Sequence, residues 1–212
     1  MCDKGLNNFD IIYYINLEHR KDRYEHINKE LLKTNIDVSK INRINGLYLK
    51  DFGILGCAKS HILALEAFIK TSSNIKNCVI FEDDFIFTKE QNEINELINS
   101  FFKYIEEYDV LMLASNTLYE IETQFSFITK IINAQTLSGY SVSKKFAPIL
   151  LENYKTSVIH LEKIGYKVHN FCFDIYMKQL QPQSLWFCLN PKIGKQIESY
   201  SDIENKVVDY NC

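Results

Sequence analysis

Apolar runs and amphipathic segments alternate along the first half of the chain. The runs that predict buried strands are short and bounded by polar residues, and they lie at residues 9–17, 41–44, 78–81 and 109–114. Segments in which apolar residues recur every three or four positions predict helices at residues 22–33, 55–70 and 89–108. Asp22 is placed to cap the first of these helices. Strands that alternate with helices are typical of a doubly wound, parallel sheet.

The second half of the chain follows another pattern. Apolar and polar side chains alternate over residues 119–143, which predicts antiparallel strands. A helix is predicted at residues 144–161, a short helix begins near Asp174, and a last strand lies at residues 184–189. We therefore predict an α/β fold, a single Rossmann-like domain in which helices flank a mixed, mostly parallel sheet.

Length and charge restrict the classes of protein to consider. A chain of 212 residues with 46% hydrophobic content can bury one substantial core, so we expect one domain. The net charge of -3 gives no electrostatic reason to expect nucleic acid as a partner, because phosphate neutralisation needs a basic face. No run approaches the roughly 18 apolar residues of a membrane span, and the N-terminus has no apolar signal region. We expect a cytoplasmic protein whose six cysteines are reduced thiols.

Three adjacent carboxylates, Glu82, Asp83 and Asp84, follow the strand predicted at residues 78–81. Ligands of such sheets bind beyond the carboxyl ends of the strands, and a divalent cation would relieve the repulsion among the carboxylates. In extended backbone Glu82 and Asp84 share a face while Asp83 points away, so a Mg²⁺ or Mn²⁺ ion between the first two could bridge the phosphates of a nucleotide-sugar. We expect the triplet on an exposed loop, and a solvated acidic turn remains the alternative.

Other candidate residues follow strands or open helices. The EHRKDR segment contains Arg20 and Arg23, which suit forked phosphate contacts, or it is an ordinary charged loop. The GILGCAKSH segment is neither a P-loop nor a dinucleotide fingerprint, and a lone helical histidine such as His61 is usually structural. Asp174 is either a helix cap or a general base.

Seven segments occur in an order that resembles glycosyltransferase family 25, which includes bacterial lipooligosaccharide galactosyltransferases and collagen galactosyltransferases. They are INLEHRKDR, GILGCAKSH, FEDDF, DVLMLAS, SGYSVSKKFA, FDIYM and YSDIE. The resemblance spans roughly residues 11–210, and its specificity comes from the order and separation of modest motifs. It implies a nucleotide-diphospho-sugar transferase fold of the GT-A type, with a nucleotide-binding half at about residues 9–115 and an acceptor half at about residues 116–212.

The resemblance also implies the chemistry and the site. It implies an inverting enzyme that uses Mn²⁺ or a similar ion, a UDP-sugar donor carrying galactose or glucose, and a glycan or hydroxylysine-type protein acceptor. Transferred to this chain, the residues that bind or support the donor are Asn16, Arg20, Arg23, Ser60, His61 and Asp83. Glu82 and Asp84 are the metal ligands, and Asp174 is the general base. No histidine follows His169 to serve as a late metal ligand, so Gln196 or water would complete the shell.

Two other functions are compatible with the same residues. One is a nucleotide-sugar-binding partner module without turnover. The other is a metal-dependent phosphohydrolase or nuclease built on the acidic triplet, although the lack of a basic groove counts against a nuclease.

Overall fold

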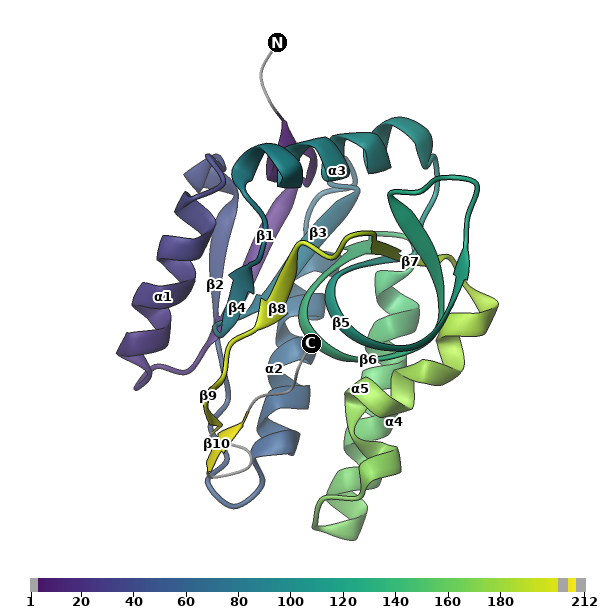
Figure 1. The fold of residues 1–212 in the computed structure, drawn as a ribbon. Coiled ribbons are helices and arrows are strands. Elements are labelled where there is room, and N and C mark those ends of the chain that lie inside the picture. The colour runs from purple at the N-terminus through teal and green to yellow at the C-terminus, as the bar shows by residue number, and fades with distance from the viewer. Residues whose placement is uncertain (1–3, 202–205, 209–212) are drawn as a thin grey trace.

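A six-stranded mixed sheet forms the centre of the computed structural model, which describes residues 4–201 and 206–208 (Figure 1). Its strands are β1 (Ile11–Asn16), β2 (Ile41–Asn45), β3 (Asn77–Glu82), β5 (Val110–Glu122), β6 (Ile128–Ser143) and β7 (Trp186–Leu189). They lie in the order β2-β1-β3-β6-β5-β7, and β6 alone among these strands runs antiparallel to its neighbours. The predicted mixed, mostly parallel sheet is confirmed.

Helices cover both faces of this sheet. The α-helices are α1 (Lys21–Leu32), α2 (Gly53–Ile69), α3 (Gln91–Tyr104), α4 (Ala147–Ile164) and α5 (Phe173–Tyr176). Short 3₁₀ helices lie at Gly5–Asn8, Val38–Lys40, His169–Phe171 and Met177–Gln183. Among the described residues, no helix is both long enough and apolar enough to cross a membrane.

Side chains of β3 point alternately to the two faces of the sheet, and each face has its own hydrophobic core. Cys78 and Ile80 pack with α2 and α4, whereas Val79 and Phe81 pack with α1 and α3 on the opposite face. All four side chains are fully buried, which is why this strand has a continuous apolar sequence.

Local predictions differ from the structure at three places. Asp22 does not cap α1. Arg20 occupies the N-cap position, where its side chain makes no capping hydrogen bond. Asp22 lies in the first turn of the helix, and its carboxylate forms an ion pair with Arg20 Nη2 at 2.8 Å. The antiparallel pair is longer than predicted, because β5 continues beyond its pairing with β7 and stays paired with β6 through several register shifts. The sequence predicts no strand after residue 189, whereas the structure has β8 (Gly194–Gln196), paired with β4 (Phe85–Phe87), and the antiparallel pair of β9 (Ser199–Ser201) and β10 (Lys206–Val208). Strands of three residues are too short to carry a periodic signal.

The parallel pairing of β1 and β3 brings their carboxyl ends to one edge of the sheet, with Ile15 opposite Glu82. The loop before α2 closes over this edge. A Cβ at Gly56 would lie 2.4 Å from Leu47 O, so only glycine lets this loop approach the first turn of the helix.

Candidate active site

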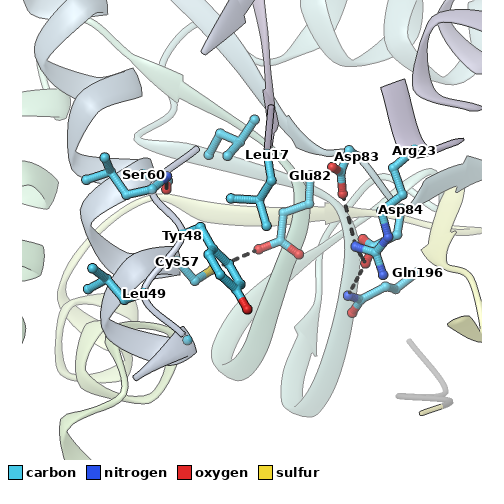
Figure 2. A pocket seen from close by; sticks show the side chains of 13 residues that line it. Leu17, Arg23, Tyr48, Leu49, Cys57, Ser60, Glu82, Asp83, Asp84 and Gln196 are labelled. Atoms are coloured by element: carbon cyan, nitrogen blue, oxygen red, sulfur yellow. Dashed lines mark hydrogen bonds and ion pairs between the residues drawn. The ribbon is translucent and has the colours of Figure 1, made fainter. Parts of the chain in front are cut away.

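A cavity opens at the carboxyl edge of β1 and β3 (Figure 2). Residues from β1, α1, the loop after β2, α2, the acidic turn and β8 line it: Ile15, Leu17, Arg23, Leu47, Tyr48, Leu49, Gly53, Cys57, Ser60, Glu82, Asp83, Asp84 and Gln196. We call it the donor cavity, after the nucleotide-sugar donor that the resemblance leads us to expect there. It brings together the acidic triplet, Arg23 and Ser60, as the sequence predicted for a shared site.

Arg23 is the cation that faces two members of the triplet. Its Nη1 donates to Asp83 Oδ1 at 3.0 Å and to Asp84 Oδ2 at 2.8 Å. Asn16 Nδ2 donates to the other oxygen of Asp83 at 2.7 Å and to Arg20 O at 3.1 Å. Asp83 is therefore fixed from both sides by residues of β1 and α1. The Arg20 guanidinium pairs with Asp22 and is not among the groups that line the donor cavity.

Asp84 lies in a buried position between Arg23 and Gln196, whose Nε2 donates to Asp84 Oδ2 at 3.0 Å. Burial, together with the neighbouring charge of Glu82, raises the pKa of Asp84 to about 7. Burial also raises the pKa of Asp83. Within the described chain, Asp84 Oδ1 is buried and has no hydrogen-bond partner. A divalent cation would satisfy that oxygen and remove the cost of ionising the carboxyl group.

The geometry of the triplet differs from the predicted alternation of an extended strand. The chain leaves β3 at Glu82 and turns at Asp83 and Asp84, so these two side chains lie together beside Arg23 while Glu82 points toward Cys57 (Figure 2). The expectation of an exposed loop is also wrong, because Asp83 is 6% exposed and Asp84 is 4% exposed.

Glu82 belongs to a second cluster, on the side of α2. His61 Nε2 lies 3.1 Å from Glu82 Oε1, and Cys57 Sγ donates to the same oxygen at 3.5 Å. His61 is fully buried, and its Nδ1 lies 3.1 Å from the Tyr140 hydroxyl. Burial acts to raise the pKa of Glu82, but the hydrogen bonds from His61 and Cys57 and the nearby positive charges together outweigh burial, and the pKa is lowered. His61 therefore favours the ionised form of Glu82.

Ser60 supports the wall of the donor cavity. Its Oγ donates to Gly56 O at 2.7 Å within α2 and accepts from Leu47 N at 2.8 Å. The side chain is buried, and these bonds hold the loop after β2 against the helix.

A second cavity adjoins the first, and Cys57, Glu82 and Gln196 line both. Its other walls are Ile54, Gln135, Thr136, Leu137, Lys167, His169, Cys172, Phe173, Asp174 and Ile175. We call it the acceptor-side cavity, after the acceptor that we expect on the side of Asp174. The structure thus places Asp174 across Glu82 from the donor cavity.

Asp174 does not cap α5, since Cys172 is at the cap position. Burial raises the pKa of Asp174, whose Oδ2 accepts from Thr136 N at 3.4 Å. Thr136 has a φ of 62°, an uncommon conformation for a β-branched residue, and such strain is often found at functional sites.

Sequence reasoning missed three residues of the site. Cys57 could have been found, because it precedes His61 by one helical turn and shares its face. Tyr140 and Thr136 lie on β6, which reaches the site because it pairs with β3. The local sequence pattern does not indicate which strand pairs with β3, so these two residues could not be found from it. The four described cysteines, Cys57, Cys78, Cys172 and Cys188, are free thiols as expected; Cys2, Cys212 and residues 202–204 of the YSDIE segment lie outside the described residues.

Comparisons with known proteins address the family and the fold. The family model of Glycosyltransferase family 25 (LPS biosynthesis protein) matches residues 51–171, more than half of the chain. That range includes the acidic triplet, Ser60 and His61, but not Asn16, Arg23 or Asp174. No curated protein matches the chain.

Solved structures resemble it in fold at low sequence identity. A glycosyltransferase involved in the glycosylation of the major capsid of PBCV-1 has a TM-score of 0.51 and 9% identity, with 92% of this chain and 96% of that chain covered. Mannose-1-phosphate geranyltransferase from Thermus thermophilus has a TM-score of 0.49 and 8% identity, with 84% and 72% covered. The predicted GT-A type of fold is supported by the first of these two structures.

Proposed function

Since the chain belongs to glycosyltransferase family 25, we propose that this glycosyltransferase is inverting and metal-dependent, and that it moves galactose or glucose from a UDP-sugar to a hydroxyl group of a glycan or a hydroxylated protein side chain. The observation that carries the proposal is the meeting of two cavities at Glu82, with Asp83 and Asp84 on one side and Asp174 on the other.

The donor side would bind the nucleotide-sugar through residues that converge on the edge of the sheet. Arg23, which lines the donor cavity, would hold the nucleotide and is suited to forked phosphate contacts, while Asn16 and Arg20 would help to hold it from beside the cavity. Ser60 and His61 would act through their neighbours, because Ser60 fixes the loop that lines the cavity and His61 orients Glu82. Asp83 would keep Asn16 and Arg23 in position.

Glu82 and Asp84 would hold Mn²⁺ or Mg²⁺. Their carboxylate oxygens are the ligands that hard cations prefer, and the unpartnered Oδ1 of Asp84 fits such an ion. The bound ion would neutralise charge on the departing diphosphate. Gln196 lies beside Asp84 and is available to support it from β8.

Asp174 would act as the general base. Its raised pKa suits removal of a proton from an acceptor hydroxyl, which then attacks the anomeric carbon from the side opposite the diphosphate. One attack of this kind inverts the anomeric configuration.

Incubation of the protein with Mn²⁺ and a panel of UDP-hexoses tests this function, with UDP release as the measurement. We expect the protein to release UDP slowly without an acceptor. Asp84→Asn and chelation of the metal should each abolish this release. Tight UDP-sugar binding without any release would indicate the partner module instead. Cleavage of simple phosphate esters without sugar transfer would indicate a phosphohydrolase.

Asp174→Asn separates binding from transfer. We expect this variant to bind UDP-sugar and Mn²⁺ normally and to lose transfer to acceptor by about 10²- to 10⁴-fold, the range of a general base. Because both residues have nearly the same volume, the fold should be kept. An unchanged transfer rate would exclude Asp174 as the base.

A further inference from the structure

Cys57, His61 and Glu82 form a ligand set that the proposed transfer does not use as a unit. One ligand atom from each residue lies within 4.8 Å of the others. Glu82 Oε1 is 3.5 Å from Cys57 Sγ and 3.1 Å from His61 Nε2. Tetrahedral Zn²⁺ with ordinary bond lengths sets its sulfur and oxygen ligands about 3.6 Å apart, and its nitrogen and oxygen ligands about 3.4 Å apart. These two ligand pairs therefore have nearly the spacing of a zinc site before any ion binds.

The ligand atoms of this cluster also differ in kind from those of Glu82 and Asp84, the pair proposed to hold Mn²⁺ or Mg²⁺. A thiolate and an imidazole select Zn²⁺ over Mg²⁺ and Mn²⁺, which prefer oxygen. Cys57 lines both cavities, so an ion and a fourth ligand such as water can reach it from solvent. The Tyr140 hydroxyl beside His61 Nδ1 provides the partner that zinc-bound histidines usually have, and it holds Nε2 toward Glu82.

We propose that Cys57, His61 and Glu82 form a second metal site, selective for Zn²⁺ and similar thiophilic ions, at the junction of the two cavities. On binding, the Cys57 thiol loses its proton to solvent, and His61 coordinates through the lone pair of Nε2 while Nδ1–H donates to Tyr140. The site takes Glu82 away from the hard metal. Zn²⁺ is therefore an inhibitor of transfer; this consequence rests on the proposed function, whereas the binding does not.

Titration of the metal-free protein with Co²⁺ tests the binding directly. We expect a thiolate-to-cobalt charge-transfer band in the near ultraviolet and the intense visible bands of four-coordinate cobalt, both removed by an equivalent of Zn²⁺. Cys57→Ser should lose the charge-transfer band. Cys188→Ser is the matched control, because its thiol lies on β7, away from β3 in the strand order, and it should keep the band. Absence of the band in the wild type, or its survival in Cys57→Ser, would overturn the proposal.

Tyr140→Phe tests the supporting contact. Loss of a partner of this kind weakens metal binding by roughly tenfold to a hundredfold, and we expect that loss in the Zn²⁺ affinity with the charge-transfer band retained at saturation. An unchanged affinity would exclude the role given to Tyr140.

The inhibitory consequence is measured as the fraction of UDP release that Zn²⁺ removes in the presence of excess Mn²⁺. The wild type should lose most of its own rate, and Cys57→Ser should lose a much smaller fraction of its own. Equal fractional loss in both would overturn the inhibition and leave the cobalt result standing. A wild type that releases no UDP even without Zn²⁺ would contradict the proposed function alone.

Discussion

Arg23 faces the carboxylates of Asp83 and Asp84 in a largely buried position. The exposed fraction is 13% for the Arg23 side chain and 6% for that of Asp84. Two buried carboxylates without a cation nearby are unstable, so the arginine matters to the fold as well as to any ligand.

Arg23→Ala should therefore lower the free energy of unfolding by about 3–5 kcal/mol at pH 8, which is above the pKa of Asp84. Denaturation by urea measures this change, and added Mn²⁺ should restore part of it in the variant. Lys59→Ala is the matched control: its partner Glu162 is 46% exposed, and the loss should be within about 1 kcal/mol. A similar loss in both variants would contradict a special role for Arg23.

The raised pKa of Asp84 predicts how the metal-free protein responds to pH. In the unfolded chain this carboxyl group loses its proton near pH 3.8, whereas in the folded chain it keeps the proton up to about pH 7. The folded state binds more protons between these values, so the contribution of Asp84 to stability falls as the pH rises through this range.

Unfolding free energies measured in a chelator from pH 4 to pH 8 should show this fall in the wild type relative to Asp84→Asn. Saturating Mn²⁺ should remove it, because the ion binds the ionised carboxylate. A difference between the two proteins that does not change with pH would contradict the assignment.

At the scale of elements, the pairing of β4 with β8 fixes the acidic turn. Asp84 O accepts from Ile197 N at 2.9 Å, and Phe85 lies opposite Gln196 in the ladder. This pairing is what brings Gln196 to Asp84 across a separation of 112 residues. The Phe85 ring packs where two glycines, Gly139 and Gly194, leave space for it.

Gly194→Ala should disturb this arrangement. A Cβ there would lie 2.0 Å from Phe85 Cζ and 2.3 Å from Phe85 Cε2, and 3.0 Å from the backbone oxygen of Ile86, so the Phe85 ring would have to move. We expect a loss of about 1–3 kcal/mol in unfolding free energy, the usual cost of overpacking, together with weaker Mn²⁺ binding. The double variant Gly194→Ala/Phe85→Leu should lose less unfolding free energy than the sum of the losses in the two single variants. A loss equal to that sum would argue against the clash.

At the scale of the whole molecule, the donor cavity joins segments from the first strand to β8. A ligand that fills it contacts segments that lie far apart in the sequence. Ligand that binds only the folded state stabilises it by about 2.7 kcal/mol at a concentration of 100 times Kd.

UDP and Mn²⁺ together should therefore raise the melting temperature by roughly 5–10 °C for a chain of this size. Either alone should give a much smaller shift, since the ion and the diphosphate bind each other. Asp84→Asn should abolish the joint effect, and a full shift with UDP in the presence of a chelator would contradict metal dependence.

The sequence by itself determined the layered sheet and the place of the acidic triplet at its carboxyl edge. These features follow from local hydrophobic periodicity: the continuous apolar run of β3 must be covered on both faces, and the residue after it emerges at the edge. The order of several modest motifs also predicted membership of glycosyltransferase family 25, which the family model confirms over residues 51–171.

Only the tertiary structure decided how the triplet is divided. The turn after Glu82 sends Asp83 and Asp84 to Arg23 and leaves Glu82 with Cys57 and His61, contrary to the alternation of an extended strand. Tyr140, Thr136 and Gln196 reach the site through the strand order and the β4–β8 pairing. Such contacts depend on which distant segments become neighbours, and no local period encodes that choice.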